Sequence, residues 1–390
     1  MFKKTIHLLI IALMIIITLP LKRAQAIPAF ARKYRFSCNT CHVAIPKLKA
    51  YGDEFAGNGF KIPDGEEPKR AYINTGDETL MLLRELPLAI RFDTYVQASD
   101  REEAKTDLQT PYGLKLLSGS PITKHISYYF YFYIFERGEI AGIEDALIYI
   151  NNIANTELDL TIGQFQVCDP LFKRELRLTY EDYLLYKMKP EQSDIKLTYE
   201  RGLMATYGFD FGLDMTAMVL NGNGIGEAGE DLLFDKDNDK SYAVRLLQGI
   251  SFVNIGLFAY SGREKILSDA DTTNSSNQVM IYGPDLTLGN DNIELNVQYL
   301  QREDKFNITG KQKMKGIMAG VSYFPKADQS KFIYSLLYNK VEDDTGGNDY
   351  ETATASISHM AARNVRLLAE ITYDIIIKKS RFTVGLVSAF

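Results

Sequence analysis

The feature that most constrains this chain is an alternation of apolar and polar residues that recurs from about residue 86 to the C-terminus. In "NIELNVQYLQR" (292–302), every second residue from Ile293 to Tyr299 is apolar, and the residues between them are Glu, Asn and Gln. "NVRLLAEITYDI" (364–375) repeats the pattern. Because neighbouring side chains of a strand point to opposite faces, such runs predict β-strands with one apolar and one polar face. Further runs lie at 88–97, 126–136, 143–150, 158–164, 195–199, 204–211, 242–247, 253–260, 279–288, 317–324, 332–341 and 353–360.

This alternation is compatible with a soluble sandwich or propeller as well as with a membrane barrel. Three features favour the barrel. Many runs approach the length of about ten residues that a tilted strand needs to cross a bilayer. Many polar-face residues are charged, which a water-filled lumen allows and a packed core does not. The chain also ends in "RFTVGLVSAF" (381–390), which alternates up to Phe390 and resembles the assembly signal of bacterial outer-membrane barrels.

Residues 86–390 therefore predict an all-β fold, a transmembrane outer-membrane β-barrel. About 305 residues, at about 19 per strand and connection, give about 16 strands, an even number as in bacterial barrels of this type. The apolar faces would contact outer-membrane lipid. Since the chain contains no Trp, Tyr and Phe are left to form the aromatic girdles at the membrane interfaces.

The N-terminus has the layout of a secretory signal peptide. Lys3 and Lys4 precede an apolar run at 8–21, and "RAQA" ends with Ala24 and Ala26 in the small-residue arrangement of a cleavage site. A membrane anchor is the less favoured alternative, because the run is shorter than the roughly 20 residues that a spanning helix needs. We expect cleavage after Ala26 and export of the chain.

The charge of the mature chain excludes one class of partner. Removal of residues 1–26 takes away four basic residues and no acidic one, so 44 basic and 50 acidic residues become 40 and 50, and the net charge changes from −6 to −10. Such a chain does not predict a nucleic-acid partner, because phosphate binding depends on basic patches. It is compatible with cations or with basic electron-transfer partners.

Cys38, Cys41 and His42 form a C-x-x-C-H motif shortly after the predicted signal peptide. In an exported protein, two close cysteines could also form a disulfide or bind zinc, but a zinc site needs a second ligand pair at suitable spacing, and none follows. C-x-x-C-H is the attachment motif of c-type haem. The two thiols would form thioethers to one covalent haem, and His42 would be its proximal iron ligand. The third cysteine, Cys168, is predicted to be an unreactive thiol.

The residues around the motif predict a small α-helical cap that binds the c-type haem. Pro46 is suited to open a helix whose apolar face runs from Leu48 to Phe55, and Gly57 supplies a stop. Fewer than 40 residues cannot bury a useful core alone, so the barrel must help to cover the haem. The predicted organisation is a signal peptide at 1–26, the haem-binding cap at 27–65, a linker at 66–85 and the barrel at 86–390.

The sixth iron ligand is not evident near the motif, because no Met or His lies between Val43 and Leu80. A Met or His in that position would favour electron transfer, and an open position would favour ligand binding or peroxidase chemistry. Each candidate also has an ordinary interpretation as a barrel or loop residue. The candidates are Met81 and Met204, which we prefer, and His125 and His359.

Two further groups of residues are candidates for contact with the haem. In "FKRELRL", Arg174 and Arg177 could pair with the haem propionates, although a charged turn is the favoured interpretation. In "SYYFYFYIFE", Tyr129, Tyr131 and Tyr133 share one face of a predicted strand. They could pack against a haem in the lumen or fill the lumen themselves.

The segment "DKDND" presents Asp235, Asp237 and Asp239 at alternating positions, as calcium loops do. The EF-hand pattern fails, because Lys240 stands where Gly is needed and Leu246 where the bidentate Glu belongs. A solvated loop is therefore the favoured interpretation.

A signal peptide, a small C-x-x-C-H cap and an outer-membrane barrel together resemble the cytochrome–porin fusion proteins of the bacterial outer membrane. The segment "IPAFARKYRFSCNTCHVAIPKLKAYGDEFAGNGF" is similar to the haem segment of the iron-oxidising members of that family. "GQFQVCDPLFKRELRLTYEDY" and "RGLMATYGFD" are similar to segments of other barrels in the family. The resemblance implies electron transfer across the outer membrane, with iron(II) oxidation as the best-known activity.

The leading hypothesis from the sequence is a monohaem electron-transfer protein whose barrel holds the haem in or at its lumen. Its partners would be a periplasmic electron-carrier protein and an extracellular donor or acceptor such as iron. One alternative is a diffusion porin with a structural or sensory haem. Another is a haem peroxidase or ligand-binding protein.

Overall fold

The computed structural model describes residues 29–62, 72–73, 76–77, 82–83, 87–101, 103–229, 231–235, 237–266, 275–308 and 310–390. The predicted signal peptide, most of the predicted linker and the candidate ligand Met81 lie outside these residues. Within them, no helix is both long and apolar enough to cross a membrane.

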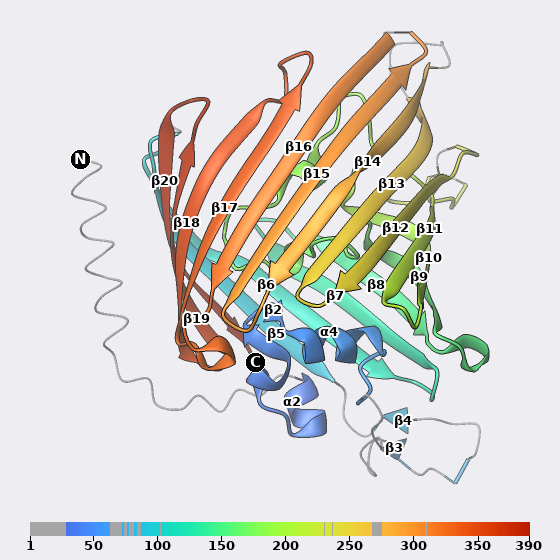
Figure 1. Cartoon of the computed structure of the whole chain (residues 1–390), viewed down its shortest axis with the longest axis vertical. Coiled ribbons are helices and arrows are strands. Elements are labelled where there is room, and N and C mark those ends of the chain that lie inside the picture. The colour runs from blue at the N-terminus through green and yellow to red at the C-terminus, as the bar shows by residue number, and fades with distance from the viewer. Residues whose placement is uncertain are drawn as a thin grey trace.

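In the described part of the chain, sixteen antiparallel strands, β5 to β20, form one closed barrel (Figure 1). Each strand pairs with the next along the chain, and β20 pairs with β5 to close the ring. The predicted barrel and its strand number are confirmed. The strands are β5 (Leu88–Ser99), β6 (Thr106–Pro121), β7 (Ile126–Glu136), β8 (Gly142–Ile150), β9 (Leu158–Gln166), β10 (Tyr199–Gly208), β11 (Leu213–Leu220), β12 (Ser241–Ile250), β13 (Val253–Ile266), β14 (Ser275–Gly289), β15 (Ile293–Phe306), β16 (Gly310–Tyr323), β17 (Phe332–Asp343), β18 (Tyr350–Ala362), β19 (Val365–Asp374) and β20 (Lys379–Ala389).

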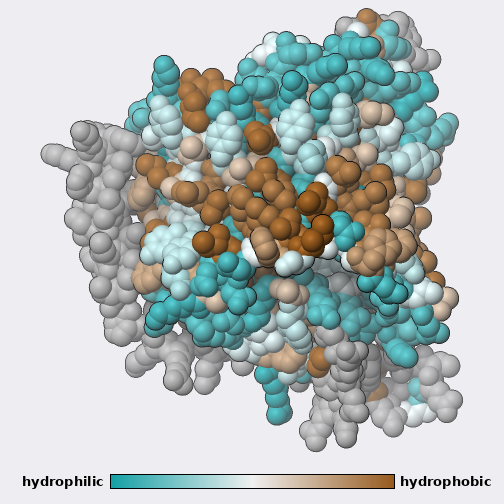
Figure 2. Space-filling model, in the orientation of Figure 1, coloured by the Kyte–Doolittle hydropathy of each residue, from teal (hydrophilic) through white to brown (hydrophobic). Residues whose placement is uncertain are grey.

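The alternation places apolar side chains on the outside of the barrel and polar side chains in its lumen. On β17, Tyr334 and Leu336 are exposed, Leu336 at 60%, whereas Ser335 and Asn339 on the opposite face are buried. Figure 2 shows apolar side chains gathered in a band across the barrel wall, with polar side chains above and below it. A strand that separates lipid from a wet lumen requires this arrangement.

Two strands were not predicted, and one predicted strand is wrong. The alternation did not reveal β6, which is interrupted by Pro111 and two glycines, or the short β11. The strand predicted at 195–199 is wrong, because β10 begins only at Tyr199 and the preceding residues belong to a connection that leaves the wall.

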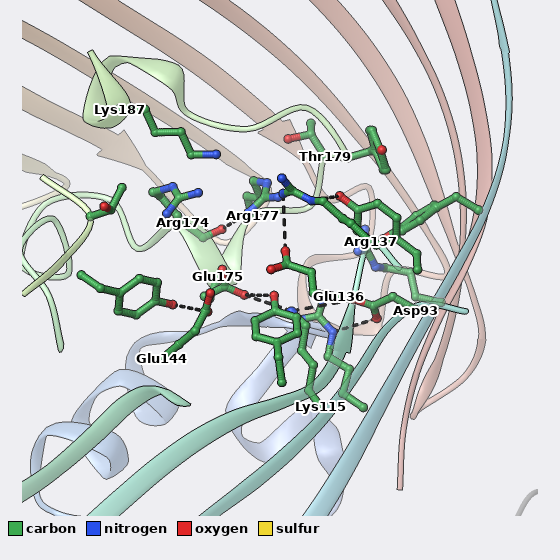
Figure 3. A pocket seen from close by; sticks show the side chains of 18 of the residues that line it. Asp93, Lys115, Glu136, Arg137, Glu144, Arg174, Glu175, Arg177, Thr179 and Lys187 are labelled. Atoms are coloured by element: carbon green, nitrogen blue, oxygen red, sulfur yellow. Dashed lines mark hydrogen bonds and ion pairs between the residues drawn. The ribbon is translucent and has the colours of Figure 1, made fainter. Parts of the chain in front are cut away.

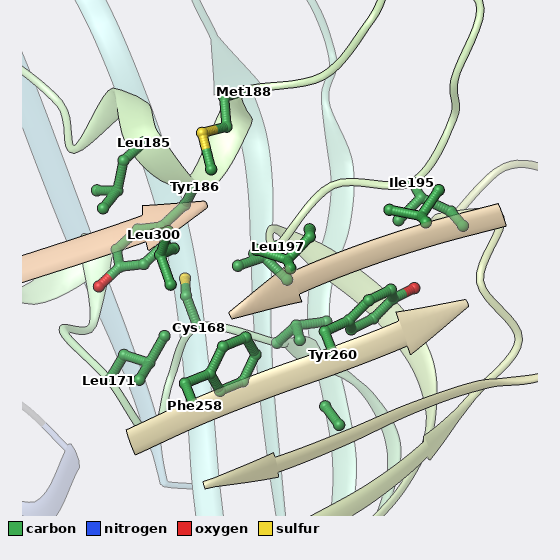
Figure 4. Close-up of a cluster of buried hydrophobic side chains, with 14 of the residues drawn as sticks. Cys168, Leu171, Leu185, Tyr186, Met188, Ile195, Leu197, Phe258, Tyr260 and Leu300 are labelled. Carbon is green, nitrogen blue, oxygen red and sulfur yellow. The ribbon is translucent and has the colours of Figure 1, made fainter. Parts of the chain in front are cut away.

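That connection, residues 167–198 between β9 and β10, folds into the barrel, and we call it the inner loop. It contains two short 3₁₀ helices, η2 (Arg174–Leu176) and η3 (Leu184–Lys187). Its apolar side chains, including Cys168 and Tyr186, form a buried cluster with inward residues of the barrel such as Phe258 and Leu300 (Figure 4). The inner loop thereby fills part of the lumen with a packed core.

Charged residues of the wall fasten the inner loop near its C-terminal end and in its middle. The fully buried Arg302 donates to the Ile195 carbonyl oxygen at 2.6 Å and pairs with Asp304 at 2.7 Å. The Glu370 carboxylate accepts the backbone N–H groups of residues 180–181 at 2.7 and 3.0 Å. Because these contacts are buried and involve backbone groups of the loop, they restrain its backbone conformation as well as its position in the lumen.

The cap, residues 29–62, is small and largely helical, as predicted. The predicted helix start at Pro46 is wrong: Pro46 lies in the turn between β1 and β2, and the helix begins at Ala50. It ends at Gly57, as predicted. The elements of the cap are α2 (Ala29–Tyr34), α3 (Cys38–Cys41), β1 (His42–Ala44), β2 (Lys47–Leu48) and α4 (Ala50–Gly57). The other short elements are β3 (Tyr72–Ile73), β4 (Leu82–Leu83), η1 (Ile153–Asn155) and η4 (Ala327–Gln329).

The cap docks onto one mouth of the barrel, which we call the cap mouth; the opposite opening is the far mouth. The Phe60 ring of the cap lies 5.4 Å from the Tyr129 ring of β7, centroid to centroid. On the other side of the cap, the Lys47 ammonium pairs with the Glu294 carboxylate of β15 at 2.6 Å. The C-terminal residue Phe390 lies at the same mouth (Figure 1).

Candidate haem site and lumen

The three residues of the C-x-x-C-H motif line one cavity between the cap and the barrel, which we call the motif cavity. Its volume is about 250 Å³. The cap contributes mainly apolar and aromatic side chains, including Phe30 and Phe55, to its lining. The opposite side is formed by β5 to β8, with Tyr129 and Tyr149 among the lining residues, and by Lys173 and its neighbours in the inner loop. Neither the cap nor the barrel builds this cavity alone.

The local backbone brings the motif residues together. Cys38 and Cys41 occupy the two ends of the single helical turn α3, and residues three apart in a helix lie on the same side. His42 then turns into an extended conformation at φ −113° and ψ 138°. Helix α4 packs tightly on this turn at Gly52, where an added Cβ would lie 2.3 Å from the Cys41 carbonyl oxygen. A residue without a side chain is therefore required at this contact.

The imidazole of His42 is held in a defined tautomer. Its Nδ1 lies 3.0 Å from the Pro46 carbonyl oxygen, which can only accept, so Nδ1 carries the proton. This leaves Nε2 as the nitrogen with a lone pair, the state in which histidine binds a metal. Burial lowers the pKa of His42, an effect only partly offset by its backbone hydrogen bonds, so the ring is neutral at pH 7.

The two motif cysteines are free thiols. Burial raises the pKa of both, so Cys38 and Cys41 are protonated at neutral pH. Two thiols and an imidazole around a cavity rich in aromatic side chains match the groups by which c-type haem is bound: covalent sulfur links, one axial nitrogen and a dry surrounding. The chemistry of the residues present therefore fits a c-type haem.

The described candidates for the sixth ligand do not line the motif cavity. Met204 on β10 points inward and packs against the inner-loop cluster. The Nδ1 of His125 donates to the Asn151 carbonyl oxygen at 3.0 Å. His359 stacks on Phe332 with ring centroids 4.6 Å apart. Among the described residues, no Met and no second His lines the cavity.

Arg174 and Arg177, predicted to meet the haem propionates, line a second cavity of about 190 Å³, which we call the lumen cavity (Figure 3). Arg174 Nε lies 3.1 Å from Asp182 Oδ1, and the nearest guanidinium nitrogen of Arg177 lies 3.6 Å from the same oxygen. The cations that do line the motif cavity are Arg91 and Lys173, and sequence reasoning missed both. The apolar alternation of β5 and the irregular inner loop gave no indication that these two side chains approach the motif.

The three tyrosines of β7 are divided between the two cavities. Tyr129 and Tyr131 line the motif cavity, and Tyr133 lines the lumen cavity. The Tyr131 hydroxyl donates to the Glu175 carboxylate at 2.9 Å, and Lys115 pairs with the same oxygen at 3.1 Å. The wall between the two cavities is thus a hydrogen-bonded polar layer.

The remaining residues singled out in the sequence have local roles. Asp235 binds Lys240 and accepts the Asp237 N–H at 3.2 Å, and Asp237 accepts the Asp239 N–H at 2.8 Å. The three aspartates are therefore engaged in contacts within the loop itself, as expected for the solvated loop predicted from the sequence. Cys168 is fully buried in the inner-loop cluster, and this burial raises the pKa of its thiol well above the usual range.

No protein-family model matches the chain, and no curated protein matches its sequence. Solved structures do match. A loop-deletion mutant of the outer membrane protein OmpT of Vibrio cholerae superposes with a TM-score of 0.56 at 11% identity, covering 78% of this chain and 99% of that one. An anion-selective porin from Comamonas acidovorans gives 0.57 at 10% identity, covering 78% and 99%.

A third similar structure is OmpF of Salmonella typhi in complex with daunomycin, with a TM-score of 0.55 at 11% identity, covering 78% of this chain and 97% of that one. At such identities the likeness concerns the fold alone. The chain therefore has the fold of an outer-membrane porin, with a cap added at one mouth and an inner loop in the lumen.

Proposed function

We propose that this protein is a monohaem cytochrome–porin of the bacterial outer membrane that transfers electrons through one covalently bound c-type haem. The observation that carries the proposal is the motif cavity, in which two thiols and an oriented imidazole face a space completed by the barrel. Cys38 and Cys41 would hold the haem by thioethers, and His42 would bind its iron. The haem supplies reversible one-electron chemistry when bound.

The surroundings of the motif support this assignment. Aromatic side chains on both sides, such as Phe55 and Tyr149, give the space beside the motif a largely apolar lining. Lys173 and Arg91 offer positive charge at its edge toward the lumen and would be available to pair with haem propionates. Lys173 is held by Asp169 at 3.2 Å and Arg91 by Asp93 at 2.9 Å, so both are positioned before any haem binds.

The orientation of the barrel follows from the lengths of its connections. Barrels of this type have short periplasmic turns and longer external loops. At the far mouth, residues 221–240 form a long connection between β11 and β12, whereas the β12–β13 and β14–β15 turns at the cap mouth contain two and three residues. We therefore place the cap on the periplasmic side, after export and cleavage behind residue 26.

In this orientation, the cap faces a periplasmic electron-carrier protein. The hydrocarbon layer is about 30 Å thick, and a single haem at the cap mouth does not span it. The donor or acceptor on the outside, such as iron, must therefore exchange electrons through the lumen, and the periplasmic partner completes the path.

A diffusion porin is a second candidate, favoured by the porin fold and by cavities in the lumen. Planar-bilayer conductance separates the two functions. Large ohmic channels from the purified protein would support diffusion, and a lumen closed to ions would support the electron-transfer assignment.

A ligand-binding or peroxidase haem is a third candidate, favoured by the lack of a Met or second His around the motif cavity in the described residues. Optical spectra distinguish it from the electron-transfer protein. A high-spin ferric haem that binds CO readily after reduction would identify an open iron position.

The main test is haem content. Full-length protein purified from outer membranes should give a pyridine haemochrome of one c-type haem per chain. The Cys168→Ala variant is the matched control, because it removes a thiol outside the motif and should retain the haem. Mature, correctly exported protein without covalent haem would contradict the proposal.

A further inference from the structure

The lumen cavity carries an excess of positive charge. Among the described residues, eight Lys and Arg side chains and four carboxylates line it. Four of the cations come from the inner loop, and the others come from β5, β6, β19 and the β7–β8 turn. Charges of one sign at the walls of a narrow, partly desolvated space concentrate solutes of the opposite sign.

Two carboxylates at or beside this cavity are already paired with more than one cation. Asp182, beside the cavity, contacts Arg174, Arg177 and Lys187, the last at 2.6 Å between ammonium and carboxylate. Asp93 lies between Arg91 at 2.9 Å and Lys115 at 3.9 Å. One carboxylate therefore faces two or three cations at each of these points.

Two cations in the cavity lining have no carboxylate within ion-pair distance among the described residues: Arg366 and Lys196. Arg366 is only 2% exposed, and its Nη1 donates to the Leu178 carbonyl oxygen at 2.6 Å and to Ser358 Oγ at 3.0 Å. Its Nε has no hydrogen-bond partner in the described part of the chain, and the same is true of the Nε of Arg177. A buried guanidinium without a counter-charge is costly, and an anion in the cavity would remove that cost.

The lumen cavity is reachable from the far mouth. A wider cavity of about 600 Å³, the mouth cavity, shares five lining residues with it, among them Arg137, Arg177 and Lys187. The lumen cavity in turn shares Arg91 and Glu175 with the motif cavity. The three cavities therefore lie in series from the far mouth to the C-x-x-C-H motif, and the cationic one is in the middle.

We propose that the lumen cavity is a binding site for a small multiply charged anion, an oxyanion or a short polycarboxylate, that enters from the far mouth. Arg366 and Lys196 place positive charge at its lining without a carboxylate partner among the described residues, and Arg177 adds a third cation. A volume of about 190 Å³ admits an anion of this size. The proposal does not depend on the haem.

Isothermal titration calorimetry with inorganic phosphate tests the site on the full-length protein in detergent. We expect saturable binding of one phosphate per chain that weakens as the salt concentration rises. The variant Arg366→Gln should weaken binding at least tenfold. The control Arg263→Gln removes an equal charge from an exposed position on β13 and should change binding less than twofold.

A second variant covers the case in which Arg366→Gln prevents insertion. Lys196→Gln changes a partly exposed residue of the inner loop, and we expect phosphate to bind about threefold more weakly. Absence of saturable phosphate binding to the wild type, or equal affinity in Lys196→Gln and Arg263→Gln, overturns the proposal. Because haem content is measured separately by haemochrome, failure of the anion site is distinguishable from failure of the haem assignment.

Discussion

The barrel has two walls that differ in regularity and in what they hold. From β10 to β18, neighbouring strands pair without a register shift, and their inward residues pack against the inner loop; we call this part the regular wall. From β5 to β8, each pair of strands contains a shift; we call this part the shifted wall. Most of the barrel-strand residues that line the motif cavity and the lumen cavity belong to the shifted wall; the cap and the inner loop provide most of the rest of the lining.

The difference shows how one fold combines a rigid support with a site. An uninterrupted ladder presents one face to the lumen, and the inner loop uses that face as a packing surface. A shift re-aims side chains and ends the strict alternation, as β-bulges near functional sites do. Asp93, Lys115 and Tyr131 all lie at such shifts, and all three take part in the polar layer between the cavities.

The largest effect is expected from removing the motif thiols. Cys38→Ala with Cys41→Ala should abolish haem attachment completely and leave a barrel that still inserts, because the strands satisfy their backbone groups among themselves. The measurements are haemochrome content and heat-modifiable migration of outer-membrane fractions. If the double variant is degraded or stays in the periplasm, the haem is part of the folding core, and the division between cap and barrel is wrong.

The support given by the regular wall is tested at Arg302. Arg302→Met leaves Asp304 buried without its ion pair, and we expect a loss of about 3–5 kcal/mol in the stability of the inner loop. Limited proteolysis should then cut the chain within 167–198, and single-channel conductance should rise. Arg263→Met, on an exposed position of β13, is the control and should leave both unchanged. Equal protease resistance of Arg302→Met and wild type would show that apolar packing alone holds the loop.

Gly52→Ala tests how closely the cap is fitted around the motif. The added methyl would lie 2.3 Å from the Cys41 carbonyl oxygen, so α4 or the motif turn must move. We expect a cost of about 1–3 kcal/mol, seen as lower haem content and an altered optical spectrum of the bound haem. Gly57→Ala lies in the same helix with nothing within 4 Å and should have no such effect. The same spectra from both variants would contradict the tight fit.

The smallest effect is expected at the contact between the cap and the regular wall. Lys47→Ala removes a partly exposed ion pair with Glu294, which should reduce cap docking by about 1 kcal/mol or less. Protease access to residues 29–62 at low and high salt measures the change. At high salt, protease access in the wild type should rise toward that of the variant, because salt screens the ion pair. A difference in protease access that persists at high salt would mean that Lys47 acts through packing instead.

The sequence predicted the regular wall better than the shifted one, for a physical reason. Period-two alternation follows from a strand between lipid and water, so β12 to β20 were all recognised, and in the regular wall only the short β11 was missed. It fails where Pro111 and glycines interrupt β6. It also fails in the inner loop, whose burial depends on tertiary packing and leaves no period in the sequence. The short alternating segment at 195–199 was therefore assigned to the wall.

In the candidate haem site, too, some residues could be predicted from the sequence and others could not. The motif residues could be predicted because Cys38, Cys41 and His42 are local in sequence and are held by one turn of helix. The residues opposite them depend on where the inner loop enters the barrel, which the spacing of residues does not reveal. Arg174 and Arg177 were therefore expected beside the motif, whereas Lys173, one position earlier, lines the motif cavity.

The joint construction of the motif cavity also sets an order of events during biogenesis. The ring closes only when β20, the last strand, pairs with β5, and Ala389 of that final strand lines the cavity beside the motif. The cavity is complete only when the cap is docked on the closed ring, with the barrel covering one side of the motif. On the proposed function, haem attachment would therefore precede docking of the cap on the barrel.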